Sequence, residues 1–188
     1  MSPPDRPKGE SRSAQREGIP AAEFPFAIGV AGPADVPDLL RLIRALAEFE
    51  RLAHLVVADE ARLVSALFGE RPVAEALIAR QRGQRAEAVG FALFFHTFST
   101  FLGQRGLWLE DLYVEPASRG RGLGRRLLSD LAAIARDRGC GRFEWAVLDW
   151  NAPAIGFYRG MGATVMPDWR IARVTGDALA RFGLDASD

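Results

Sequence analysis

A glycine-rich loop between a predicted strand and a predicted helix is the segment of this sequence best suited to binding a ligand. It reads Arg-Gly-Arg-Gly-Leu-Gly over residues 119–124, and Arg125 and Arg126 follow it. Glycine lets the backbone approach a ligand closely, and a helix that begins near Gly122 offers unpaired N–H groups at the positive end of its dipole. Arginine adds donors suited to phosphate. The loop therefore predicts a pyrophosphate site.

The sequence leaves two alternative roles open for this loop. Glycine-rich turns before helices also occur for packing alone. In a dinucleotide-binding fold, the glycine fingerprint follows the first strand of a βαβ unit. Here the loop comes late, after a series of predicted antiparallel strands, so a dinucleotide fold fits the sequence poorly.

Two adjacent carboxylates interrupt the apolar strand predicted at residues 107–114. Glu110 and Asp111 lie among large apolar side chains, where burying charge without a function is costly. Strand alternation sends the two side chains to opposite faces unless a bulge intervenes. The structural alternative is that a carboxylate only holds a nearby backbone donor or an arginine, and this suits Asp111 better than Glu110.

The elements expected to position these residues follow from hydrophobic periodicity. Helices are predicted where apolar residues recur at helical spacing, between cap signals such as Asp35, Asp59 and Gly139. Their expected spans are 35 to about 51, 59–67, 122–139 and a short helix after Asn151. Strands are expected at 26–30, 73–80, 88–98, 107–114, 142–148 and 169–174. The order β-α-α-β-β-β-α-β-α-β predicts a mixed α/β fold.

Composition limits the classes of function that the chain can serve. With 188 residues, of which 48% are hydrophobic and 26% charged, it can bury the core of one domain over residues 25–188. Residues 1–24 read as a disordered tail without a signal peptide. A net charge of zero predicts no nucleic-acid partner, and no apolar run approaches the roughly 18 residues of a membrane helix. A single cysteine, Cys140, suits a cytoplasmic protein.

Three motifs taken together resemble the GNAT acetyltransferases. They are Glu110 to Val114, Arg119 to Gly124, and Asp149 to Pro153 followed by Phe157-Tyr158. More narrowly, they resemble the spermidine/spermine (diamine) and thialysine N-acetyltransferase branch, over Phe26 to about Thr175. The resemblance implies a mostly antiparallel central sheet flanked by helices, in which the strands at 109–114 and 142–148 splay apart.

The same resemblance implies the cosubstrate and the catalytic residues. Acetyl-CoA would lie between the splayed strands, and no metal is implied. Glu110 would act as the base, through a water, and Tyr158 as the acid that protonates the departing thiolate. The expected acetyl-CoA contacts are Leu112, Tyr113, Val114, Arg119, Gly120, Arg121, Gly122, Leu123, Gly124, Arg125, Asn151 and Ala154.

Acidic residues are the expected determinants of the acceptor. By resemblance, Glu50 would bind the far end of a polyamine, and Asp111 would add negative charge to the same cleft. Trp145 is a further candidate substrate contact, although filling the core is the simpler role for the tryptophans of this chain. Two departures from the family pattern affect these sites: Met161 replaces a basic residue that reaches the cofactor, and Phe49 replaces a common tyrosine.

The sequence therefore predicts an enzyme that acetylates a primary amine of a small cationic molecule, such as a polyamine, a diamine or a thialysine-like compound. A protein or peptide N-acetyltransferase is the first alternative, and a non-catalytic acetyl-CoA-binding module is the second. By analogy with the family, the chain is expected to form a homodimer.

Overall fold

The structure is a computed structural model that describes residues 24–83 and 87–183. The chain separates into two compact units, Met1–Trp145 and Ala146–Asp188, and each is described by itself. Nearly all of the predicted tail, residues 1–23, lies outside the described residues. That residues 25–188 make a single domain stays a prediction.

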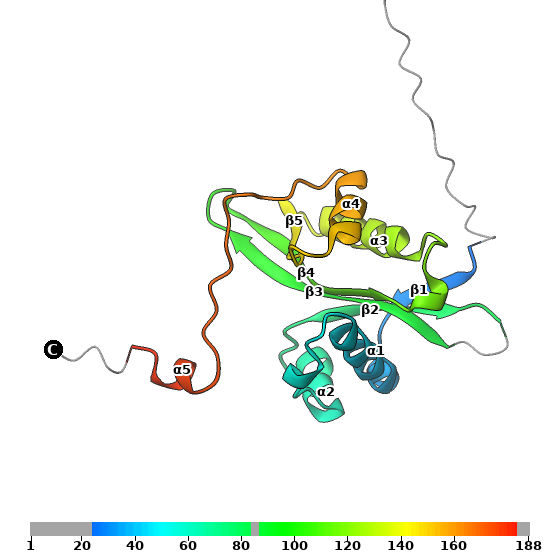
Figure 1. The fold of residues 1–188 in the computed structure, drawn as a ribbon, viewed down its shortest axis with the longest axis horizontal. Helices are drawn as coiled ribbons and strands as arrows, with labels where there is room; N and C mark the ends of the chain where they lie inside the picture. The colour runs from blue at the N-terminus through cyan, green and yellow to red at the C-terminus, as the bar shows by residue number, and fades with distance from the viewer. Residues whose placement is uncertain (1–23, 84–86, 184–188) are drawn as a thin grey trace, which may run out of the picture. The chain divides into compact units, whose positions relative to one another are not determined.

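A five-stranded sheet forms the centre of the first unit, with the strands in chain order across it (Figure 1). The first four strands pair antiparallel, and β5 pairs parallel with β4. Their bounds are β1 Phe26–Val30, β2 Glu75–Gln81, β3 Ala88–Ser99, β4 Gln104–Val114 and β5 Arg142–Trp145. The predicted mixed, mostly antiparallel fold class is confirmed.

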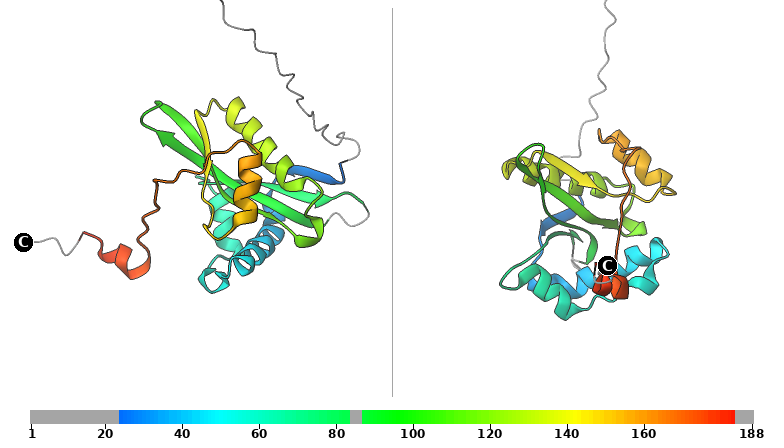
Figure 2. Two further views of the ribbon diagram at one scale, coloured as in Figure 1. Left: turned by 45° about the horizontal axis from the view of Figure 1, so that its top comes forward. Right: turned by 90° about the vertical axis from the view of Figure 1, so that its left-hand side faces the viewer.

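Helices cover both faces of this sheet (Figures 1 and 2). The helices α1 (Val36–Phe49) and α2 (Glu60–Phe68) cover one face, and α3 (Leu123–Asp137) covers the other. We call these the α1 face and the α3 face. On the α1 face, leucines of α1 form one buried cluster with side chains of β2, β3 and β4, among them Ile78, Phe91 and Tyr113.

The ends of the helices follow from local chemistry. The Asp59 carboxylate accepts a hydrogen bond from Arg62 N at 2.8 Å, as a helix N-cap should. The helix α3 ends at Gly139, whose φ of 66° is left-handed, and Cys140 N donates to Ala135 O at 2.8 Å. This is a Schellman motif, in which glycine avoids the steric penalty of the left-handed conformation.

The helix α1 ends in the same motif without a glycine. Arg51 takes a φ of 62°, and Leu52 N donates to Ala47 O at 2.8 Å. Arginine bears a steric penalty at this position that glycine avoids. The turn nevertheless fixes the backbone beside Glu50, which caps the helix.

The second unit contains the helices α4 (Ala152–Gly160) and α5 (Gly176–Arg181). The strand predicted at 169–174 is wrong, because these residues form no strand. An extended segment becomes a strand only when its backbone finds a hydrogen-bonded neighbour. Trp169 and Ile171 are instead 72% and 66% exposed. The strand predicted at 142–148 is correct in place but ends at Trp145.

Three short 3-10 helices complete the described elements and were not predicted. They are η1 Pro33–Asp35, η2 Ala53–Leu55 and η3 Pro116–Ser118. The last of these links β4 to the glycine-rich loop. In residues 24–83 and 87–183, no helix is both long enough and apolar enough to cross a membrane.

Candidate functional site

A β-bulge in β4 brings the two predicted carboxylates to one face of the sheet. Asp111 pairs with Leu93 on β3, whereas Leu109 pairs with Phe94, so Glu110 is an extra residue without a partner of its own. A bulge breaks the strict alternation of side chains. Asp111 therefore lies on the α1 face with Tyr113, and the unpaired Glu110 follows Trp108 on that face.

Glu110 and Glu50 both act electrostatically on Asp111, and we call Glu50, Glu110 and Asp111 the acidic cluster. Burial raises the pKa of the Asp111 carboxyl to about 6, with the charges of Glu110 and Glu50 acting in the same direction. Burial likewise raises the pKa of Glu50. Among the described residues, no group of His, Cys, Asp and Glu side chains is arranged to hold a metal. The acidic cluster concentrates negative charge at β4 and the end of α1.

Trp108 holds the Glu110 side chain. Its indole N–H donates to Glu110 Oε2 at 2.9 Å, and its ring packs near Phe95 with centroids 6.5 Å apart. This tryptophan was expected to fill the core, and its contact with Glu110 was not predicted. An indole two residues before a carboxylate on a strand is the only signal that the sequence offers, because such residues share a face when the alternation is regular.

Within the described part of the chain, no strand pairs with the end of β4 that carries Glu110 and Asp111 on the side of β5. Pairing between β4 and β5 ends at Leu109 and Trp145, so residues 110–114 have no partner from β5. The splay predicted between residues 109–114 and 142–148 stays a prediction, because β5 ends at Trp145. Three of the predicted acetyl-CoA contacts, Leu112, Tyr113 and Val114, lie on this stretch of β4.

The glycine-rich loop has the backbone geometry of an anion site. Gly120 and Gly122 have φ values of 73° and 82°, which side chains other than glycine rarely adopt. Among the described residues, the N–H groups of residues 120–125 have no backbone acceptor. Leu123, Gly124 and Arg125 form the first turn of α3, where unpaired N–H groups and the helix dipole favour an anion.

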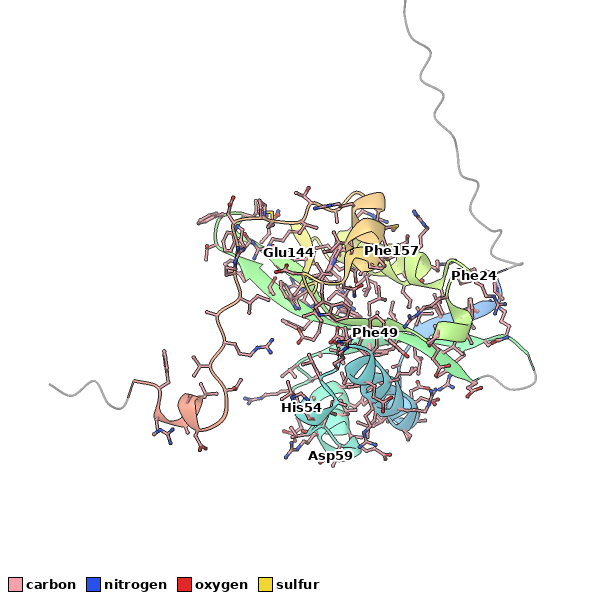
Figure 3. The ribbon with its side chains drawn as sticks, in the orientation of Figure 1. Phe24, Phe49, His54, Asp59, Glu144 and Phe157 are labelled. Atoms are coloured by element: carbon pink, nitrogen blue, oxygen red, sulfur yellow. The ribbon has the colours of Figure 1, made fainter. Side chains whose placement is uncertain are left out.

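Arg119 links this loop to the end of α1. Its Nε donates to Val114 O at 2.8 Å, and its guanidinium carbon lies 5.0 Å from the Phe49 ring centroid and 5.6 Å from that of Tyr113. Phe49 is the last residue of α1 (Figure 3). The guanidinium of Arg121 lies over the Phe26 ring at 4.9 Å. The departure at Phe49 therefore keeps an aromatic face for Arg119.

The other predicted site residues are Trp145 in β5 and three residues of the second unit. Trp145 pairs with Leu109, and Leu109 pairs with Phe94 on the other side of β4. Trp145 and Leu109 therefore lie on the α3 face, opposite to the face of the acidic cluster. Asn151, Ala154 and Tyr158 belong to the second unit. There Asn151 caps α4 by accepting a hydrogen bond from Ala154 N at 3.3 Å, and the Tyr158 ring lies 5.4 Å from that of Phe157. Their predicted roles stay predictions.

Comparison with known proteins places this geometry in a family. Residues 40–163 match the model of the acetyltransferase (GNAT) family. The chain is 40% identical over 157 residues to the thialysine N-epsilon-acetyltransferase of Mus musculus, covering 79% of this chain and 92% of that protein. It is 34% identical over 194 residues to an L-ornithine N5-acetyltransferase of Arabidopsis thaliana, covering 81% and 85%.

Solved structures agree on the fold. An integron cassette protein from the mobile metagenome of V. cholerae superposes with a TM-score of 0.70 at 24% identity, covering 87% of this chain and 99% of that one. A similarity at this level of identity supports the architecture of the sheet and helices.

Proposed function

The chain belongs to the acetyltransferase (GNAT) family and is an N-acetyltransferase, and on that premise we propose that it moves an acetyl group from acetyl-CoA to a primary amine of a small cationic molecule. The choice of a cationic acceptor rests on the acidic cluster. The mouse and Arabidopsis relatives are named for thialysine and ornithine, and each of these compounds has two amino groups.

The residues of the first unit fit acetyl-CoA as the donor. The N–H groups of residues 120–125 have no backbone acceptor in the described chain, and Gly120 and Gly122 present no Cβ to a ligand. They would hold the pyrophosphate, together with the Arg119 and Arg121 guanidinium groups. Residues 112–114 would bind the pantetheine arm along the free edge of β4. Acetyl-CoA supplies an activated thioester.

The acidic cluster sets the proposed charge of the acceptor. At neutral pH the Asp111 carboxyl, with a pKa of about 6, is ionised at a cost in free energy that a bound cation offsets. Glu50 caps α1 and Glu110 lies on β4, so the negative charge comes from two parts of the chain. An acceptor with two cationic nitrogens matches this distribution better than a monoamine does. Diamines, polyamines and thialysine-like compounds are the proposed acceptors.

Proton transfer is the chemistry that the enzyme must add. An alkylammonium with a pKa of about 10.4 is almost fully protonated at neutral pH and has no lone pair for attack. We assign Glu110 as the base that takes this proton, through a water, and Tyr158 as the acid that protonates the thiolate as the C–S bond breaks. The exposure of Glu110 within the acidic cluster supports the first assignment.

An amine screen with two variants tests this proposal. Acetyl transfer is measured with monoamines, diamines, polyamines, thialysine, ornithine and a short peptide, for wild type, Glu110→Gln and Tyr158→Phe. We expect diamino compounds to be acetylated, and each variant to lower kcat by roughly 10²–10⁴-fold. Equal rates in all three proteins would contradict the catalytic assignments. Acetylation of the peptide but of no small amine would select a peptide acetyltransferase instead.

A matched pair of helix variants tests the acceptor site. Glu50→Gln removes a member of the acidic cluster, whereas Glu48→Gln removes a carboxylate from the groove between α1 and α2, beside Arg44 and Glu60. Only the first should raise KM for a diamine. Equal effects of the two variants would show that net charge, rather than the acidic cluster, attracts the substrate. A homodimer stays a prediction.

A further inference from the structure

The contact between Trp108 and Glu110 joins the proposed base to the rigid centre of the sheet. Trp108 pairs with Phe95 on β3 and with Glu144 on β5, so its backbone is held on both sides. Glu110, by contrast, is the extra residue of the bulge, and its side chain is exposed. The 2.9 Å hydrogen bond from Trp108 Nε1 therefore ties this exposed carboxylate to a residue paired on both sides.

The hydrogen bond also distinguishes the two oxygens of the Glu110 carboxylate. Oε2 accepts the indole N–H, which leaves Oε1 to accept a proton. A glutamate loses rotamer freedom when it is ordered, and a group already held in one orientation does not lose that freedom during the reaction. The indole cannot accept a proton itself because its nitrogen is only a donor. Its effect would thus be on orientation.

We propose that Trp108 is a positioning residue, which orients the Glu110 carboxylate for proton removal from the amine. This inference rests on the proposed function, since it presumes that Glu110 is the base. A role in packing alone is the alternative, because the indole also lies near the Phe95 ring. The two roles differ in what the N–H group contributes.

Kinetics of two variants separate positioning from packing. Trp108→Phe removes the N–H and keeps an aromatic ring, whereas Phe95→Leu weakens the packing of the indole and keeps the N–H. We expect Trp108→Phe to lower kcat roughly tenfold, with KM for acetyl-CoA and amine within about twofold of wild type. Phe95→Leu should leave kcat within about twofold. Equal losses in both variants would overturn the positioning role.

An NMR measurement tests the contact without relying on turnover. The indole N–H resonance of Trp108 is identified by its disappearance in Trp108→Phe and is then followed in Glu110→Ala and Glu144→Ala. Glu144, which is labelled in Figure 3, pairs with Trp108 across the strands. Its carboxylate is bound to Arg142 Nε at 2.6 Å. We expect the resonance to shift in Glu110→Ala and to stay in place in Glu144→Ala.

The outcomes separate the two proposals. If the resonance does not move in Glu110→Ala, the hydrogen bond is absent and the positioning role is overturned even in an active enzyme. If it moves but Trp108→Phe has the kcat of wild type, the contact exists without orienting the base, which also overturns the role. If wild type acetylates no amine while the resonance still shifts, the proposed function fails and the role of Trp108 in catalysis fails with it.

Discussion

Replacing Asp111 by asparagine should stabilise the protein while weakening its binding of amines. Burial and two neighbouring carboxylates raise the pKa of Asp111 from 3.8 to about 6. A shift of one pKa unit corresponds to 1.36 kcal/mol, so the ionised carboxylate costs the folded state about 3 kcal/mol at neutral pH. Asparagine has nearly the same shape and no charge. Asp111→Asn should therefore unfold with a free energy higher by up to about 3 kcal/mol at pH 7.5.

The pH dependence of this gain follows from the raised pKa. Between pH 3.8 and about 6, the folded protein keeps a proton on Asp111 that the unfolded chain has released. The free energy of unfolding of wild type therefore falls as the pH rises through this window, and the full cost is present above it. The advantage of Asp111→Asn should shrink to roughly half a kcal/mol near pH 4.

Urea unfolding at pH 4 and pH 7.5 measures this difference. Glu48→Gln, which removes a carboxylate outside the acidic cluster, controls for the change in net charge. The same Asp111→Asn protein should bind a diamine more weakly than wild type, because it lacks one ionised carboxylate of the cluster. If Asp111→Asn were no more stable than wild type at pH 7.5, or gained equally at both pH values, the reasoning about the acidic cluster would be refuted.

Three further predictions concern other parts of the first unit. The kcat/KM for a diamine should fall as the pH drops below about 6, because Asp111 then gains a proton. In Glu50→Gln this acidic limb of the pH–rate profile should move to lower pH, and an unmoved limb would exclude electrostatic coupling between the two residues. Arg51→Gly should raise the free energy of unfolding by about 0.5–1 kcal/mol in a urea titration, because glycine adopts the left-handed φ without strain; a loss would contradict this. Gly120 has space for a methyl group, but its φ of 73° strains any other residue. Gly120→Ala should therefore weaken acetyl-CoA binding in calorimetry, and unchanged affinity would argue against the loop as the pyrophosphate site.

Local patterns in the sequence predict most of the fold, because the physical causes of those elements are local. The leucines of α1 recur at helical spacing, Asp59 caps α2, and Gly139 ends α3 in the left-handed conformation that favours glycine. The glycines of the loop at 119–124 are likewise local requirements of the backbone. The residues of these elements therefore indicate their own conformations.

Features that depend on pairing between strands escaped prediction. The bulge at Glu110 exists only because β3 and β4 change register there, and no local signal in β4 sets that register. The hydrogen bond from Trp108 to Glu110 is an exception, because residues two apart on a strand share a face under regular alternation. The segment 169–174 has apolar residues typical of a strand, but a strand also needs a neighbour for its backbone. Trp145 has its face set by its pairing with Leu109.

The most direct test of the proposed function compares a diamine with a monoamine of the same chain length as acetyl acceptors. Initial rates with acetyl-CoA give kcat/KM for each amine, in wild type and in Glu50→Gln. The acidic cluster predicts that wild type prefers the diamine by at least roughly tenfold, an advantage of about 1.4 kcal/mol, and that most of this preference is lost in Glu50→Gln. Equal kcat/KM for the two amines in wild type, or an undiminished preference in Glu50→Gln, would contradict the proposal that the acidic cluster selects the acceptor.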